Sequence, residues 1–158
     1  MPFKNVPQKF NASIKDVVIG AGATAITLGG ESVLPLYSFD APIQNAPKVG
    51  IEISDLGANR DIPGIAAFYE GAQSPVDMVK RACEKSGADF ISLTLEGADP
   101  NGQNKSIDDC VALCKQVAEA STLPLVIQGS KNTEKDNTLL SKIAEALQGK
   151  NVLLMSAK

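Results

Sequence analysis

Polar side chains gather in the segments that follow the predicted strands. These segments read SDLGANRDIPG from residue 54, EGADPNGQNK from residue 96 and GSKNTEKDN from residue 129, and a fourth begins with SAK at residue 156. Hydroxyl, carboxylate and amide groups there suit hydrogen bonding to a large polar ligand or partner, although turns and helix caps use the same residue types. The candidate ligand-binding residues are Ser54, Asp55, Glu96, Asp99, Asn101, Ser130, Asn132 and Ser156, with Asn59, Asn104 and Lys135 in the same segments.

A second candidate is the glycine-rich stretch VVIGAGATAITLGG, which begins like a dinucleotide-binding turn. Gly20, Gly22 and Ala25 have the required spacing, and Asp40 follows at roughly 20 residues, where an acidic residue binds a ribose. That turn must lead directly into a helix, whereas here a short β-prone stretch follows and two further glycines end it. We therefore predict a β-hairpin with strands at residues 16–19 and 24–28.

The cysteines do not form a recognisable metal or redox motif. Cys83, Cys110 and Cys114 have neither zinc nor iron-sulfur spacing, and the chain contains no histidine. We interpret Cys110 and Cys114 as small apolar groups one helical turn apart, in preference to a redox pair or a metal site. Without histidine, a self-contained catalytic triad is excluded.

The elements that position the polar segments alternate between strand and helix from residue 48 onward. Such alternation predicts a parallel sheet covered by helices. The strands are expected at residues 48–54, 89–95, 123–129 and 151–157. The preceding segment contains Pro35, Pro42 and Pro47, which predict an extended connection.

Each predicted helix begins with a hydroxyl residue followed three positions later by an acid. The first runs from a cap at Ser74, with Pro75 and Asp77, to Gly87. Ser106 with Asp109 begins the second, and Thr133 with Asp136 begins the third, which ends at Gly149. The apolar residues of the three helices are Val76, Val79, Ala82 and Cys83; Cys110, Leu113, Cys114 and Val117; and Leu139, Leu140, Ile143, Ala144 and Leu147.

The strands have one apolar face and one mixed face. In the first strand, Ile51 and Ile53 alternate with Glu52 and Ser54, and the second strand repeats this pattern. A barrel of the (β/α)8 TIM type explains the pattern, since outward residues pack on helices while inward residues face one another. In that setting Glu52 is expected to form a salt bridge inside the barrel rather than act as a catalytic group.

Composition limits the classes of partner. The net charge of −3 and the pI near 5.0 leave no basic stripe for phosphates, and aromatic residues for base stacking are few, so nucleic acid is not an expected partner. No apolar run has the length of a membrane helix, and MPFKNVPQKF lacks the apolar segment of a secretory signal. A cytoplasmic location is expected.

The chain has too few strands for a closed barrel. We expect an amino-terminal segment at residues 1–47, comprising the hairpin and the extended connection, and the first half of a TIM barrel at residues 48–158, with four strands and three helices. A complete barrel has eight strand-helix units over about 250 residues. We therefore expect the other half to lie in a longer chain or in a partner.

Four stretches together resemble a known family. LGGESVLPLYSFDAPIQNAPKVGIEISD, CEKSGADFISLTLEGADPNGQNKS, LPLVIQGSKNTEKDNTLL and NVLLMSA are similar to the amino-terminal half of the corrinoid iron-sulfur protein small subunit. That subunit is also called the delta subunit of the acetyl-CoA decarbonylase/synthase complex. One departure is the sequence Gly129-Ser130-Lys131, where relatives often have a Gly-Cys-Gly turn, so contacts at that turn are not transferred.

The resemblance implies a cofactor and partners. A large subunit would carry the iron-sulfur cluster and a corrinoid (cobalamin) domain, forming a heterodimer in which the mouth of the barrel caps the corrinoid. Together they would carry a methyl group from a methyltetrahydrofolate or tetrahydrosarcinapterin methyltransferase to acetyl-CoA synthase, with this chain not catalytic alone.

Two alternatives stay open. The first is a pterin-dependent methyltransferase on a related barrel, in which Asp55, Asp99 or Asn101 would hold the pterin. The second is a free-standing flavodoxin-like binding domain built on a four-stranded sheet.

Overall fold

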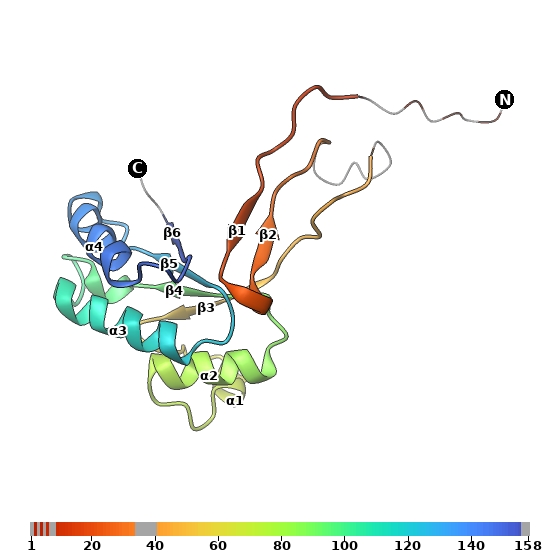
Figure 1. Cartoon of the computed structure of the whole chain (residues 1–158). Coiled ribbons are helices and arrows are strands. Elements are labelled where there is room, and N and C mark those ends of the chain that lie inside the picture. The colour runs from red at the N-terminus through yellow and green to blue at the C-terminus, as the bar shows by residue number, and fades with distance from the viewer. Residues whose placement is uncertain (1, 3, 5, 7–8, 34–40, 156–158) are drawn as a thin grey trace.

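The computed structural model describes the chain except residues 1, 3, 5, 7–8, 34–40 and 156–158, and it contains two sheets (Figure 1). The smaller sheet is an antiparallel hairpin of β1 (Val17–Ile19) and β2 (Ile26–Leu28). The larger sheet is parallel, in the order β3 (Gly50–Ser54), β4 (Phe90–Thr94), β5 (Leu125–Gln128) and β6 (Leu153–Met155). The predicted hairpin and parallel sheet are both confirmed.

The parallel sheet is open, with β3 and β6 at its edges. Neighbouring strands pair in a continuous register, in which Glu52 lies beside Ser92 and Ser92 lies beside Val126. Within the described residues, this sheet does not close into a barrel. What is present is an α/β arrangement in which each strand lies next to its neighbour in sequence.

The helices all lie on one side of this sheet (Figure 1). They are α1 (Pro63–Phe68), α2 (Pro75–Lys85), α3 (Ile107–Ala120) and α4 (Thr133–Ala146). At the start of α2, the Ser74 side chain accepts a hydrogen bond from the Asp77 backbone, and the Asp77 side chain accepts one from the Ser74 backbone. Ser106 caps α3, as predicted: its hydroxyl accepts from the Asp109 backbone N–H and donates to the Asp109 carboxylate. Among the described residues, no helix has the length and hydropathy needed to cross a bilayer.

The core lies between the sheet and these helices. Ile53, Ile91, Leu93 and Ile127 project toward the helices, and each is at most 1% exposed. Of the residues assigned to the helix faces, Val76, Cys83 and Leu113 are half-buried and Ala144 is exposed, while the others are buried.

No helix of the described residues lies on the opposite face, whose polarity is mixed. Thr94 and Val126 are buried near the centre, whereas Glu52 and Met155 are exposed near the edges. The mixed strand pattern thus corresponds to a sheet with one covered face. The salt bridge expected for Glu52 is not found, because no ion pair within the described part of the chain includes this residue.

The hairpin lies at the amino-terminal end of the parallel sheet. The backbone N–H of Gly20 donates to the Asn151 carbonyl at 2.8 Å, and the Asn151 amide donates to the carbonyls of Val18 and Gly20. Gly20 has a φ of +80°, and a Cβ there would lie 2.8 Å from the Pro124 side chain, so close packing explains this glycine. The segment after Gly22 forms a single 3-10 turn, η1 (Gly22–Thr24), before β2.

A dinucleotide site is thereby ruled out at this turn, since no helix follows the second glycine to hold a pyrophosphate. Asp40, which completed the fingerprint spacing, and Pro35 lie outside the described residues. Pro42 and Pro47 lie in a segment without regular secondary structure, as expected.

The start of α4 corrects one prediction. Thr133 is the first helical residue, and the cap is Asn132, whose side chain accepts a hydrogen bond from the Lys135 backbone at 3.0 Å. Asp136 turns back to the loop before the helix, where it accepts hydrogen bonds from the Ser130 backbone and side chain. The helix also ends at Ala146, three residues before the predicted stop at Gly149.

Cys110 and Cys114 are buried one turn apart on the core side of α3. Burial raises the pKa of the Cys114 thiol to about 12 and also raises the pKa of Cys110. Both thiols are therefore protonated at neutral pH and pack as small apolar groups, which agrees with the interpretation from spacing.

Candidate functional site

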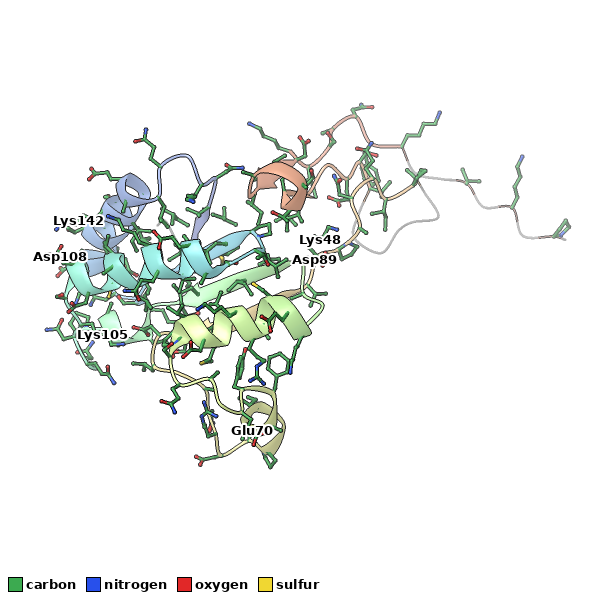
Figure 2. The ribbon with its side chains drawn as sticks, turned by 60° about the horizontal axis from the view of Figure 1, so that its bottom comes forward. Lys48, Glu70, Asp89, Lys105, Asp108 and Lys142 are labelled. Atoms are coloured by element: carbon green, nitrogen blue, oxygen red, sulfur yellow. The ribbon has the colours of Figure 1, made fainter. Side chains whose placement is uncertain are left out.

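The carboxyl ends of β3, β4 and β5 bring the predicted polar segments to one end of the sheet. Figure 2 shows Lys105 at this end, whereas the Lys48–Asp89 ion pair, 3.5 Å long, lies at the opposite end near the hairpin. We call the residues that follow β3, β4 and β5 at this end (54–59, 95–105 and 129–135) the carboxyl rim. The structure therefore brings together the predicted residues of three strands, while Ser156 lies outside the described residues.

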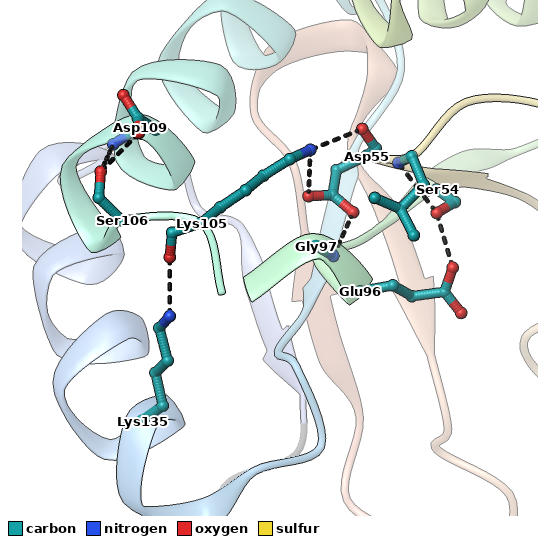
Figure 3. A network of polar contacts seen from close by, with 9 residues as sticks. Ser54, Asp55, Glu96, Gly97, Lys105, Ser106, Asp109 and Lys135 are labelled. Atoms are coloured by element: carbon teal, nitrogen blue, oxygen red, sulfur yellow. Dashed lines mark hydrogen bonds and ion pairs between the residues drawn. The ribbon is translucent and has the colours of Figure 1, made fainter. Parts of the chain in front are cut away.

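Asp55 connects two loops of the rim (Figure 3). Its side chain is fully buried; one oxygen accepts the Gly97 backbone N–H at 2.8 Å, and the other pairs with the Lys105 Nζ at 3.0 Å. The same Nζ donates to the Asp55 backbone carbonyl at 3.1 Å. Since every described contact of this carboxylate is internal, Asp55 holds the loop after β4 against the end of β3.

Gly97 is required by this arrangement. It lies in the 3-10 turn η2 (Glu96–Ala98), and a Cβ at this position would lie 2.6 Å from Asp55 Oδ2 and 2.8 Å from the Lys105 side chain. Only a residue without a side chain allows the carboxylate and the lysine to approach this backbone.

A second lysine connects α4 to the same loop. Lys135 Nζ donates to the Asn104 side-chain oxygen and to the Lys105 carbonyl, both at 2.7 Å. Asn104 has a φ of 49°, in the left-handed region, and this contact helps to hold its position. Lys105 and Lys135 therefore tie the loops after β3, β4 and β5 into one unit.

Ser54 and Glu96 form a polar pair at the carboxyl ends of β3 and β4. The Ser54 hydroxyl donates to Glu96 Oε2 at 2.7 Å and accepts the Leu56 backbone N–H at 3.2 Å. Glu96 is exposed and Ser54 is half-buried. Unlike the Asp55 carboxylate, the Glu96 carboxylate is open to solvent and can accept further hydrogen bonds.

The other predicted rim residues make local contacts. Asp99 Oδ1 accepts the Asn101 backbone N–H at 2.9 Å and so closes a turn. The Ser130 hydroxyl donates to the buried Asp136 at 2.7 Å and accepts the Asn132 backbone N–H at 3.2 Å. These contacts are the turn and cap geometries that the same residue types favour.

An open cleft of about 430 Å³ lies where the end of β3 meets α1 and α2. Its polar side chains include Glu52, Ser54 and Glu96, and its apolar wall includes Ile65, Tyr69 and Met78. Tyr69 is 5% exposed, and its hydroxyl has no hydrogen-bond partner among the described residues. Burial raises the pKa of this hydroxyl, so it is neutral at physiological pH.

Sequence reasoning missed Lys105, Tyr69 and the role of Asp136. Lys105 pairs with a residue 50 positions away, so no local pattern indicates it. Tyr69 follows α1, a helix of six residues that begins at the end of the polar segment 54–64 and was not predicted. Pro63 at the first helical position was the available signal for α1.

The sequence was compared with known proteins. A delta subunit of the acetyl-CoA decarbonylase/synthase complex from Archaeoglobus fulgidus is 32% identical, over 98% of this chain and 36% of the relative. The delta 1 subunit from Methanosarcina thermophila is 33% identical over 87% of this chain and 31% of the relative. The delta subunit from Methanothermobacter thermautotrophicus is 31% identical over 95% of this chain and 39% of the relative.

The chain thus spans less than two-fifths of the length of these curated relatives. The sequence model described as "CO dehydrogenase/acetyl-CoA synthase delta subunit" matches residues 16–158, which include both sheets and the whole carboxyl rim. The stretches that resembled this family in the sequence all lie within the match. On this evidence the chain belongs to the CO dehydrogenase/acetyl-CoA synthase delta subunit family.

Proposed function

We propose that this chain is part of the small subunit of a corrinoid iron-sulfur methyl-carrier protein. In this proposal its carboxyl rim covers one face of a corrinoid held mainly by a large subunit. The assembly receives a methyl group from a methyltetrahydrofolate or tetrahydropterin methyltransferase and passes it to acetyl-CoA synthase.

The observation that carries this proposal is that the loops of the carboxyl rim are held together by internal contacts in a chain of this family. Three loops are tied together by Asp55, Lys105 and Lys135, so their backbone presents a rigid surface. On that surface, Ser54 and Glu96 place polar oxygen atoms at the cleft beside the end of β3. Preorganised polar groups on rigid loops favour binding of a large ligand, because little conformational freedom is lost.

The rim residues fit a corrinoid through hydrogen bonding rather than through ligation of cobalt. A corrinoid carries amide side chains around its ring, and the hydroxyl and carboxylate oxygens of Ser54 and Glu96 can accept from amide N–H groups. The cobalt of the bound cofactor would supply the methyl-transfer chemistry. The residues of this chain would orient the ring and limit the access of water and partners to it.

We also propose that the sheet continues into a (β/α)8 barrel in the complete protein. The helices lie on one side of the parallel sheet, and neighbouring strands are consecutive in sequence, both of which are features of such barrels. A crystal structure of a complete relative of this chain tests this directly. A finished open sheet with helices on both faces would contradict it.

Binding to a corrinoid-depleted large subunit tests the functional proposal. We expect corrinoid absorbance to shift on titration into the mixture of both subunits, with weaker binding when this subunit carries Glu96→Ala. The matched control is Glu84→Ala, on the exposed surface of α2. Equal corrinoid binding with and without this subunit would contradict the proposal. Saturable binding of methyltetrahydrofolate to this subunit alone would instead support a pterin-dependent methyltransferase.

A further inference from the structure

The β1–β2 hairpin has an apolar face that the described part of the chain covers only in part. Directly opposite residues of an antiparallel pair share a face, so Val17 with Leu28 and Ile19 with Ile26 form one apolar face. Along this face the exposure increases with distance from the turn. Ile19 is 2% exposed, Ile26 and Leu28 are half-buried, and Val17 is 46% exposed. The apolar face therefore continues beyond the residues that cover it.

The hairpin crosses the amino-terminal end of the parallel sheet. A crevice of about 170 Å³ separates its turn from the end of α3, and the lining includes Gly20 and Thr24 on the turn and Ala118 and Ser121 at the helix end. Figure 1 shows β1 and β2 running from this turn away from α2 and α3. The contacts between Gly20 and Asn151 attach the hairpin beside the start of β6. The hairpin thus extends from the helix side toward the helix-free side of the sheet.

Apolar side chains also lie on the helix-free face near this end of the sheet. Val126 in β5 is 3% exposed, and neither it nor Ile19 belongs to the core between the sheet and the helices. On the same face, the half-buried Phe90 ring fills the space that a side chain at Gly50 would occupy. A second apolar region, distinct from the helix-side core, is therefore present at the amino-terminal end.

The position of the hairpin indicates what covers the rest of its apolar face. The hairpin is attached beside the start of β6, an edge strand with which a further strand can pair. The chain spans 36% of the Archaeoglobus fulgidus relative, so relatives have further chain that could supply such strands. The strands of parallel sheets are mostly apolar and all begin at the same end. Their first residues would therefore meet the hairpin.

We propose that the hairpin closes the amino-terminal end of the barrel, with Val17 and Leu28 packed against the first residues of the strands that follow β6 in the complete subunit. The inference rests on the barrel put forward with the proposed function, and it assigns no residue to the corrinoid. Its consequence for function is that ligands and water reach the barrel interior from the carboxyl rim and not from the opposite end.

A matched pair of substitutions in the complete subunit tests this. Val17 and Val18 are neighbours, 46% and 49% exposed in this chain, and Val18 lies with Thr27 on the other face of the hairpin. Threonine keeps the β-branched shape of valine, so the substitution adds mainly the cost of burying a hydroxyl. We expect Val17→Thr to lower the thermal unfolding midpoint by about 2–4 °C, and Val18→Thr to change it by less than about 1 °C.

A labelling experiment gives a second readout that does not depend on stability. Val17→Cys and Val18→Cys proteins are treated with iodoacetamide, and mass spectrometry follows the peptide that contains the new thiol. We expect the thiol of Val17→Cys to react at least about tenfold more slowly than that of Val18→Cys, because the covered face must open before it reacts. Both measurements use the complete subunit without the large subunit.

Each outcome decides between occupants of the face. Equal midpoints and equal labelling rates in the two pairs would show that the face is open, and the inference would be wrong while corrinoid binding could still support the proposed function. Protection that requires the large subunit, or that increases with protein concentration, would assign the face to that partner or to a second copy and would overturn the inference. A complete subunit whose sheet stays open would remove the barrel and the inference together.

Discussion

Replacement of Gly97 by alanine tests the central contact of the rim. A Cβ at this position would lie 2.6 Å from the Asp55 carboxylate and 2.8 Å from the Lys105 side chain, against an ordinary separation of 3.4–4 Å. Relief of this overlap requires the carboxylate to move away from the Gly97 N–H, whose hydrogen bond is 2.8 Å long. Because the Asp55 side chain is fully buried, water cannot replace the lost donor without rearrangement.

The expected loss of stability in the Gly97→Ala protein follows from two effects that are not additive. Loss of a hydrogen bond to a buried carboxylate costs about 1.5–3 kcal/mol, and overpacking typically costs about 1–3 kcal/mol. Since movement of the carboxylate relieves the overlap by lengthening the bond, we expect the free energy of unfolding to fall by about 2–3 kcal/mol.

Urea-induced unfolding followed by circular dichroism measures this change. The matched control is Gly64→Ala, because Gly64 lies in the first turn of α1 and a Cβ there meets nothing within 4 Å. Alanine at this helical position should be neutral or stabilising by up to about 1 kcal/mol. A Gly97→Ala protein whose free energy of unfolding is within about 0.5 kcal/mol of the wild type would refute the steric reasoning.

Three further predictions concern individual side chains. Asp136→Asn should lower the free energy of unfolding by about 1–3 kcal/mol, because it weakens two hydrogen bonds from Ser130 to a buried carboxylate. Urea unfolding measures this change in stability, and an unchanged unfolding midpoint would contradict the prediction. Cys114 should resist iodoacetamide at pH 8 in the native protein while the partly exposed Cys83 reacts, since burial raises the Cys114 pKa to about 12. Mass spectrometry of the alkylated peptides measures the labelling of each cysteine, and equal labelling would contradict the prediction. The capping contacts of Asp77 lower its pKa below the ordinary value of 3.8. The stabilising effect of its carboxylate is therefore complete above the unfolded-state pKa and is lost as the pH falls through the lower folded-state pKa. The Asp77→Asn protein should lose less stability than the wild type between pH 5 and pH 2, as measured by thermal unfolding.

The elements were predictable from the sequence where their signals are local. Alternating apolar residues predicted β3 and β4, and the pairs Ser74–Asp77 and Ser106–Asp109 predicted two helix starts, because each signal lies within one turn or one strand. The predicted start of α4 was wrong for a physical reason. Asn132 and Thr133 are both good capping residues, and Asp136 found donors in the preceding loop instead of at the cap.

The site was predictable only as a location. Parallel strands place their carboxyl ends together, so the positions of Ser54 and Glu96 at one end of the sheet follow from topology. Their roles depend on contacts between distant segments, such as the pairing of Asp55 with Lys105 across 50 residues. Such pairs have no periodicity or spacing, and the buried hydroxyl of Tyr69 becomes apparent only when the packing of α1 is known.

The contacts at the rim decide which substitutions can report on function. A loss of corrinoid binding in an Asp55 variant would be ambiguous, because this carboxylate holds the loop after β4 and its removal displaces Glu96 as well. Glu96 is exposed and its described hydrogen bond comes from the Ser54 hydroxyl, so Glu96→Gln changes the charge presented to a ligand while the loop remains tied through Gly97. If Glu96→Gln and Gly97→Ala reduce binding equally, then the position of the loop matters and the charge does not. A larger effect of Glu96→Gln on corrinoid affinity would attribute recognition to the carboxylate itself.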